Sequence, residues 1–215
     1  MPLTHLIFDL DNTLYPPSRG VVERVDARIT QFMVDRLGIA YDDASALRAR
    51  YRDAHGTTLN GLMLHHEVAP DEYLDCVHEI AVDELLAPDP ALAAMLAALP
   101  HAKVVFTNGS LTHAERVLAC LDVRAHFAAV FSLERVAYVP KPERAAFESV
   151  LTALGAAADG CLFIDDRADN CATARALGMR AVLVGAADGD GACDDAIASI
   201  LELPALVARL DGARP

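Results

Sequence analysis

Two carboxylates and a hydroxyl follow a short apolar run near the start of the sequence. The run Leu6–Phe8 ends at Asp9, and Asp11 and Thr13 occupy the next two alternate positions. Ligands of open α/β sheets bind beyond the carboxyl ends of the strands, so Asp9 is placed where chemistry takes place. If the backbone stays extended, the Asp11 side chain points the same way as that of Asp9. Two carboxylates this close favour a divalent cation such as Mg²⁺ between them, although an ordinary acidic turn uses the same residue types.

A threonine and a lysine later in the chain have the chemistry to bind an anion. Thr107 and Asn108 come just before a predicted helix, where unpaired backbone amides and the helix dipole favour a phosphate. The alternative there is ordinary helix capping by Asn108 or Ser110. Lys141 precedes Pro142 at another predicted helix start, where a cation is unfavourable unless an anion lies beside it. The alternative for Lys141 is a solvated surface lysine.

A second pair of carboxylates, Asp165 and Asp166, ends the apolar run Cys161–Ile164. Adjacent carboxylates at a buried strand end are costly without a counter-ion, so one of them should reach the metal. The alternative is capping of the following helix by Asp166 or Asp169.

These side chains need a scaffold that brings distant strand ends together. Short buried strands are predicted at residues 3–8, 102–106, 128–131, 161–164 and 179–184. Beyond residue 102 the strands alternate with amphipathic helices, which implies an α/β fold with a parallel sheet and helices on both faces. After the last of these strands, a helix or helix pair is expected around 196–210.

The segment between the first two strands is much longer than one crossover needs. Residues 16–87 contain helical patterns only, and they are predicted to form a helical cap over the carboxyl end of the first strand. The predicted domains are therefore an α/β core of residues 1–15 and 88–215 and a cap of residues 16–87.

The composition excludes several classes of protein. The 215 residues are 53% hydrophobic, enough for a large core. No stretch reaches the roughly 18 apolar residues of a membrane span, and the N-terminus lacks a secretory pattern. A net charge of −13 argues against binding nucleic acids or anionic membranes, and five cysteines without a CxxC pair predict reduced thiols. We expect a cytoplasmic protein, a monomer or weak homodimer, that binds a small molecule.

Taken together, the four groups of residues resemble the motifs of the haloacid dehalogenase (HAD) superfamily. Phe8-Asp9-Leu10-Asp11-Asn12-Thr13-Leu14 is similar to its first motif, DxDxT. The pairs Thr107-Asn108, Lys141-Pro142 and Asp165-Asp166 follow in the order of the other three motifs. The resemblance covers nearly the whole chain. It implies a Rossmann-like core with strand order 5-4-1-2-3 and the inserted helical cap of subfamily I.

The resemblance also implies a catalytic role for each motif. Asp9 would be the nucleophile that attacks phosphorus, and Asp11 the general acid and base. Thr107, Asn108 and Lys141 would bind the phosphoryl group. Lys141 would also be catalytic, because it neutralises charge that develops on the phosphoryl oxygens.

Mg²⁺ is the cofactor that the resemblance implies. The Asp9 carboxylate, the Asp11 backbone carbonyl and the Asp166 carboxylate would hold the ion, with Asp165 behind them. The sequence departs from the superfamily's frequent pattern at Arg167 and Asn170.

A narrower resemblance, to pyrimidine 5′-nucleotidases, rests on the segments Asp9–Pro16, Gly56–Leu62 and Phe163–Asp166. It implies a nucleoside 5′-monophosphate as substrate, with UMP or CMP first. The cap residues that would face the substrate are Thr57, Thr58 and Asn60. The alternative for this cap segment is a helix start capped by a threonine.

The sequence therefore predicts a Mg²⁺-dependent phosphomonoester hydrolase that works through an aspartyl-phosphate intermediate. A phosphatase or phosphomutase acting on sugar phosphates or other small phosphometabolites is the first alternative, because the cap decides the substrate. A dehalogenase fits less well, since carbon–halogen cleavage does not need the acid that Asp11 supplies. A non-catalytic binding protein with this fold is the alternative of another class, and the intact acidic residues and lysine disfavour it.

Overall fold

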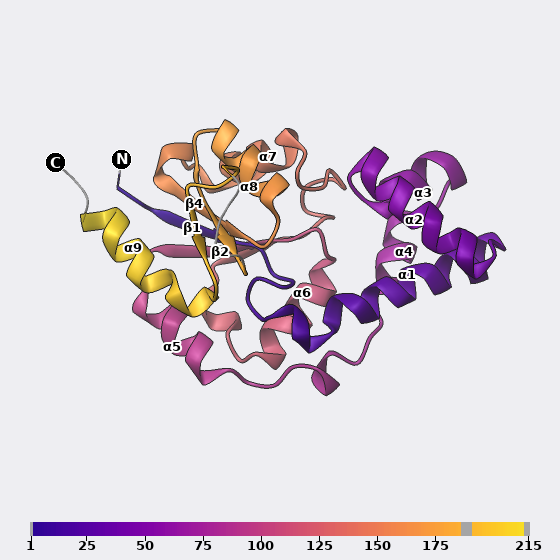
Figure 1. Cartoon of the computed structure of the whole chain (residues 1–215), viewed down its shortest axis with the longest axis horizontal. Helices are drawn as coiled ribbons and strands as arrows, with labels where there is room; N and C mark the ends of the chain where they lie inside the picture. The colour runs from indigo at the N-terminus through magenta and orange to yellow at the C-terminus, as the bar shows by residue number, and fades with distance from the viewer. Residues whose placement is uncertain (1, 186–190, 213–215) are drawn as a thin grey trace.

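The computed structural model describes residues 2–185 and 191–212. In these residues the chain forms a six-stranded parallel sheet of order β3-β2-β1-β4-β5-β6 (Figure 1). The strands are β1 (His5–Phe8), β2 (Ala102–Phe106), β3 (Ala129–Phe131), β4 (Cys161–Asp165), β5 (Arg180–Val184) and β6 (Asp195–Ile197). The α-helices are α1 (Val21–Leu37), α2 (Tyr41–His55), α3 (Thr58–His66), α4 (Pro70–Val77), α5 (Pro90–Ala98), α6 (Leu111–Cys120), α7 (Arg144–Leu154), α8 (Ala168–Ala176) and α9 (Leu203–Gly212). The predicted class and the order 5-4-1-2-3 are confirmed, and β6 extends the sheet beside β5.

Helices cover both faces of the sheet, as the alternation along β1 requires. Leu6 and Phe8 pack into the core cluster that includes α5, α6 and α9, whereas Ile7 packs into the cluster that includes α7 and α8. Figure 1 shows these two groups of helices on opposite sides of the strands. All three side chains are buried, which explains why the run is continuously apolar.

The central position of β1 brings three strand ends to one edge. Phe8 pairs in register with Val105 of β2 and Ile164 of β4. The N–H of Asp9 then donates to the carbonyl of Ile164 at 2.8 Å. Asp9 and Asp165 therefore leave the sheet side by side, with the end of β2 on the other flank of Asp9.

Helices α1 to α4, here called the cap helices, connect β1 to β2 and form a separate group at the right of Figure 1. Helix α1 ends at Gly38, whose φ of 66° lies in the left-handed region that glycine tolerates. Thr57 caps α3, because its side chain accepts a hydrogen bond from the N–H of Asn60 at 3.1 Å. The domain boundaries at residues 15 and 87 stay a prediction.

Two segments differ from the sequence expectation. Residues 196–197, expected in a helix, belong to the edge strand β6, because a short apolar run suits a strand as well as a helix. The helix expected to start at Pro142 begins at Arg144 instead. The residues before it form a turn in which the N–H of Glu143 donates to the carbonyl of Pro140 at 2.9 Å.

The structure also bears on membrane spans and on the cysteines. Among the described residues, every helix is too short or too polar to cross a membrane. The five cysteines are free thiols in the structure.

Candidate active site

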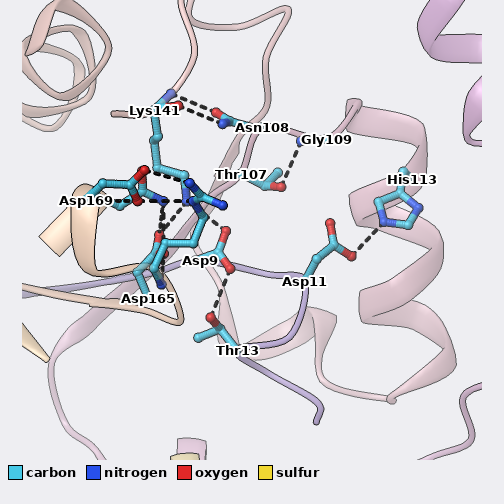
Figure 2. Close-up of polar contacts among 12 residues, drawn as sticks. Asp9, Asp11, Thr13, Thr107, Asn108, Gly109, His113, Lys141, Asp165 and Asp169 are labelled. Atoms are coloured by element: carbon cyan, nitrogen blue, oxygen red, sulfur yellow. Dashed lines mark hydrogen bonds and ion pairs between the residues drawn. The ribbon is translucent and has the colours of Figure 1, made fainter. Parts of the chain in front are cut away.

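A buried lysine joins two carboxylates beyond the carboxyl edge of the sheet. Nζ of Lys141 donates to Oδ1 of Asp9 and to Oδ2 of Asp165, each at 2.7 Å (Figure 2). The hydroxyl of Thr13 donates to the other oxygen of Asp9 at 2.9 Å. Lys141 is only 2% exposed, so the alternative of a solvated surface lysine is wrong.

The lysine is held both at its backbone and at its ammonium group. The Asn108 side chain donates to the carbonyl of Lys141 at 3.0 Å and accepts from its N–H at 2.8 Å. The ammonium lies 5.1 Å and 5.5 Å from the ring centres of Phe106 and Phe163, where cation–π attraction favours it. Asn108 therefore fixes the loop that delivers Lys141 to the site, in addition to lining the cavity described below.

The two carboxylates at the end of β4 have different surroundings. The carboxylate of Asp165 is fully buried and accepts from Lys141, from the Asn170 amide at 2.9 and 3.0 Å, and from the N–H of Arg167 at 2.9 Å. Asp166 instead lines the cavity. Arg167 occupies the N-cap position of α8, so Asp166 does not cap this helix.

The acidic cluster holds more negative than positive charge. Oxygens of Asp9, Asp165 and Asp166 lie within 4.8 Å of one another, with the Lys141 ammonium bonded to two of these carboxylates. Burial raises the pKa of Asp9 and, although Lys141 opposes it, raises the pKa of Asp165 to about 6. Burial and the neighbouring Asp165 raise the pKa of Asp166 to about 6. A hard divalent cation would relieve this repulsion, and carboxylate oxygens are the ligands that Mg²⁺ prefers.

Asp11 lies apart from the acidic cluster. Strand β1 ends at Phe8 and Asp11 already lies in a turn, so the alternation of the strand does not extend to Asp11. Its Oδ1 accepts from Nε2 of His113 at 2.8 Å and from the hydroxyl of Tyr15. Figure 2 shows one oxygen of the carboxylate toward His113, so Asp11 does not join Asp9 in the acidic cluster, although both residues line the cavity described below. Burial alone would raise the pKa of Asp11, but His113 and Tyr15 lower it to about 2.

Thr107 and Ser110 have separate tasks where α6 begins. Ser110 caps the helix by accepting from the N–H of His113 at 3.2 Å, so the capping alternative holds for Ser110. The oxygen of Thr107 accepts from the N–H of Gly109 at 2.9 Å, which leaves its hydroxyl proton free to donate into the cavity that it lines. A side chain at Gly109 would lie 3.3 Å from that oxygen and 3.2 Å from the ring of His113, so only glycine fits without displacement.

A cavity of 720 Å³ opens in front of these groups, a size typical of small-molecule sites. Among the residues that line it from the core are Asp9, Asp11, Thr107, Asn108, Lys141 and Asp166. From the cap helices, Thr57 and Thr58 line it as well. Asn60 is not among the lining residues, because its amide donates to the carbonyl of His55 at 3.2 Å and its N–H is engaged by Thr57.

Sequence reasoning does not single out Tyr15, His78 or His113, which the structure places around Asp11. A signal for His113 exists in principle. Helical side chains lean toward the N-terminus, so a histidine in the first turn of a helix that starts at the site reaches back to it. His78 comes from the end of α4, and no local pattern connects it to the first motif.

Comparison with known proteins identifies the family of the chain. Residues 3–178 match the model of a family described as haloacid dehalogenase-like hydrolase. The chain is 38% identical over 112 residues to Phosphatase MT3486 of Mycobacterium tuberculosis, a match that covers 52% of this chain and 49% of that protein. It is 25% identical over 193 residues to Phosphate metabolism protein 8 of Saccharomyces cerevisiae, covering 82% of this chain and 60% of that protein. The chain thus spans about half to three-fifths of the length of these two relatives.

A solved structure is also similar over its whole length. The 2-haloacid dehalogenase from Pseudomonas syringae pv. Tomato DC3000 has a TM-score of 0.62 and 20% sequence identity, and the match covers 97% of this chain and 99% of that one. At this identity the similarity shows a shared fold.

We expect Lys141→Met to destabilise the metal-free protein by about 3–5 kcal/mol at pH 8, because two buried carboxylates lose their counter-charge. A carboxyl group whose pKa is raised by folding destabilises the protein increasingly as pH rises from the unfolded value through the folded one. The pKa of Asp165 is about 6 even with the lysine present, so the loss should be smaller at pH 5. Urea unfolding at both pH values, in the presence of a chelator, measures it.

Lys103→Met is the matched control. Lys103 is also buried, but its ammonium donates to the backbone carbonyls of Leu99 at 2.6 Å and His101 at 3.0 Å. Its removal leaves no buried carboxylate without a counter-charge. The loss of unfolding free energy should therefore change little between pH 5 and pH 8. Equal, pH-independent losses for the two variants would contradict the charge balance described for Lys141.

Proposed function

Because the chain belongs to the haloacid dehalogenase-like hydrolase family, we propose that it is a Mg²⁺-dependent phosphomonoester hydrolase that works through an aspartyl-phosphate on Asp9. The observation that carries the proposal is the contact of Asp9 with both Lys141 and Thr13 at the cavity, within 4.8 Å of the Asp166 carboxylate. This arrangement gives a carboxylate nucleophile fixed in place, a cation to face phosphoryl oxygens, and ligands for a metal.

In the first step, an oxygen of Asp9 attacks phosphorus, and the electron pair of the breaking phosphorus–oxygen bond stays on the leaving oxygen. Asp11 gives that oxygen a proton. In the second step, Asp11 takes a proton from a water molecule, whose oxygen attacks phosphorus and releases Asp9. His113 and Tyr15 lower the pKa of Asp11 to about 2, so the carboxylate is in the ionised form that accepts a proton in the second step. The negative charge of a bound phosphate would raise this pKa toward the protonated form that the first step needs.

The chain's own groups fit a magnesium ion in this site. Asp9 and Asp166 would hold it with their carboxylates, together with the backbone carbonyl of Asp11, which accepts no hydrogen bond from the described residues. Asp165 is occupied by Lys141, Arg167 and Asn170, which favours Asp166 as the direct ligand. When bound, the ion would neutralise charge on the phosphoryl oxygens.

For the substrate we propose a nucleoside 5′-monophosphate, with UMP and CMP first. Support comes from the sequence resemblance of the first loop and the cap, from a cavity large enough for a nucleotide, and from the position of Thr57 and Thr58 on its wall. The hydroxyl of Thr58 has no hydrogen-bond partner in the part of the chain that the structure describes, so it is available to a substrate. Sugar phosphates are the competing substrate class.

Two other functions have less support. The fold that the chain shares with a haloacid dehalogenase does not decide the chemistry, and a dehalogenase has no use for a leaving-group acid such as Asp11. A non-catalytic binding protein would not need the charge repulsion among Asp9, Asp165 and Asp166. The oligomeric state stays a prediction of monomer or weak homodimer.

Replacing the nucleophile should abolish turnover. We expect Asp9→Asn to lower Mg²⁺-dependent hydrolysis of p-nitrophenyl phosphate by about 10⁴-fold or more, because an amide cannot form the covalent intermediate. Asp35→Asn, an exposed change on α1, is the control and should behave like the wild type. Near-normal activity of Asp9→Asn would rule out the assigned nucleophile.

Removing a metal ligand should weaken Mg²⁺ binding before substrate enters. Calorimetric titration of the substrate-free protein with MgCl₂ should show at least a tenfold weaker affinity for Asp166→Asn, since even outer-shell changes commonly cost about 10- to 100-fold. Asp169→Asn is the matched control, because the Asp169 carboxylate is paired with Arg167 at 2.6 Å outside the acidic cluster. Equal affinities for the two variants would remove Asp166 from the metal site.

A substrate panel separates the two substrate classes. We expect the highest kcat/KM for UMP and CMP, and a lower value for glucose 6-phosphate. Thr58→Val should lower kcat/KM for the nucleotides about fivefold, the cost of one hydrogen bond, and leave p-nitrophenyl phosphate unaffected. Thr152→Val, whose exposed hydroxyl donates to the carbonyl of Glu148, is the control. A preference for the sugar phosphate would favour the competing class.

A further inference from the structure

One oxygen of the Asp11 carboxylate is occupied by two donors. Nε2 of His113 lies 2.8 Å from Oδ1, and the Tyr15 hydroxyl donates to the same atom. An ionised carboxylate oxygen accepts about two hydrogen bonds, so these donors saturate Oδ1. The proton exchange of Asp11 is then left to Oδ2.

The free oxygen faces the phosphate-binding side of the cavity. A Cβ built on Gly109 would lie 3.7 Å from Oδ2 of Asp11 and 3.3 Å from the hydroxyl oxygen of Thr107. Both oxygens therefore border the same small space, and Thr107 and Asp11 both line the cavity. A group that exchanges a proton with Oδ2 sits next to the hydroxyl that would hold the phosphoryl group.

The His113 ring is itself held by the cap helices. It is 1% exposed and stacks on the His78 ring, with centroids 4.6 Å apart and planes at 26°. His78 ends α4: its Nδ1 donates to the carbonyl of Leu74 at 3.0 Å, and its own carbonyl accepts from Arg116 of α6 at 3.3 Å.

Within residues 2–185 and 191–212, no other hydrogen bond fixes the ring. Nδ1 of His113 is buried and has no hydrogen-bond partner among the described residues. The orientation of the ring therefore depends on its contact with Asp11, on the stacking against His78 and on its place in the first turn of α6.

We propose that His113 is a positioning residue that, together with Tyr15, holds Asp11 by Oδ1 so that Oδ2 exchanges protons with the attacking water and the leaving group. This inference rests on the proposed function, and it adds a residue from α6 to the machinery. In the second step, the water oxygen forms a bond to phosphorus and its proton passes to Oδ2. The electron pair of the phosphorus–oxygen bond to Asp9 returns to the Asp9 carboxylate.

The test separates this step from formation of the intermediate. p-Nitrophenolate leaves without being protonated, so transfer of its phosphoryl group to Asp9 does not need Asp11. His113→Phe keeps an aromatic ring against His78 and removes the donor. We expect a burst of p-nitrophenolate followed by slow turnover, with kcat and KM both about 10- to 100-fold lower and kcat/KM within about threefold of the wild type.

Three further variants make the result specific. His113→Gln places an N–H near the former Nε2 and should restore most of kcat. Tyr15→Phe removes the other donor to Oδ1 and should show the same burst, so the inference stays testable if His113→Phe fails to fold. His101→Phe is the matched control: His101 is a partly buried histidine paired with Asp211 at 3.2 Å, its Nδ1 lacks a hydrogen-bond partner among the described residues, and it should keep wild-type kinetics.

The outcomes distinguish a failure of the positioning role of His113 from a failure of the proposed function. A loss of kcat/KM as large as the loss of kcat, without a burst, would mean that His113 is structural and would overturn the inference. Unchanged kinetics in both His113→Phe and Tyr15→Phe would overturn it as well. If the wild type shows no Mg²⁺-dependent hydrolysis of phosphate monoesters, the proposed function fails, and the inference fails with it.

Discussion

The ammonium of Lys141 lies between two buried carboxylates, and much of the surrounding structure serves to keep it there. Asn108 holds its backbone, Phe106 and Phe163 face its charge, and Asp9 and Asp165 bind it directly. One positive charge does not balance the three carboxylates of the acidic cluster. Burial keeps water from screening this excess of negative charge. A divalent cation would balance the charge of this site, and the proposed hydrolase needs such a cation at that point.

The order of the strands explains how residues far apart in the sequence come together in this cluster. Because β1 lies between β2 and β4, the first residues after three strands emerge at one edge of the sheet. Asp9 follows β1 directly, Asp165 ends β4, and Thr107 follows β2. Lys141 comes from the long loop after β3 and reaches the same edge because Asn108, beside Thr107, pairs with its backbone. A different strand order would separate Asp9 from Asp165, and Lys141 would then not contact both carboxylates.

The sequence predicts the sheet and the acidic edge well, because both follow from short apolar runs that end in polar residues. It fails where contacts depend on the exact path of a turn. An extended backbone would place Asp11 beside Asp9, but β1 ends at Phe8 and Asp11, in the turn that follows, contacts His113. The same limit applies to Asn60, whose amide is used inside the cap, and to β6, a three-residue edge strand that periodicity cannot separate from a helix. His78 reaches Asp11 only through a stack between two helices, which no sequence window contains.

The separation of Asp9 from Asp11 has a chemical consequence for the proposed mechanism. Asp9 lies among other carboxylates, and burial raises its pKa, while the Lys141 ammonium opposes that rise. Asp11 lies against His113 and Tyr15, and its pKa is lowered to about 2, so it is ionised without a cation. The pKa values of two carboxylates, two positions apart in the sequence, thus shift in opposite net directions, because their charged partners differ. Different partners around similar groups are a common way in which proteins give them different roles. Here the partners come from β4 and the loop after β3 on one side and from α6 on the other, so the division of labour follows from the topology of the sheet.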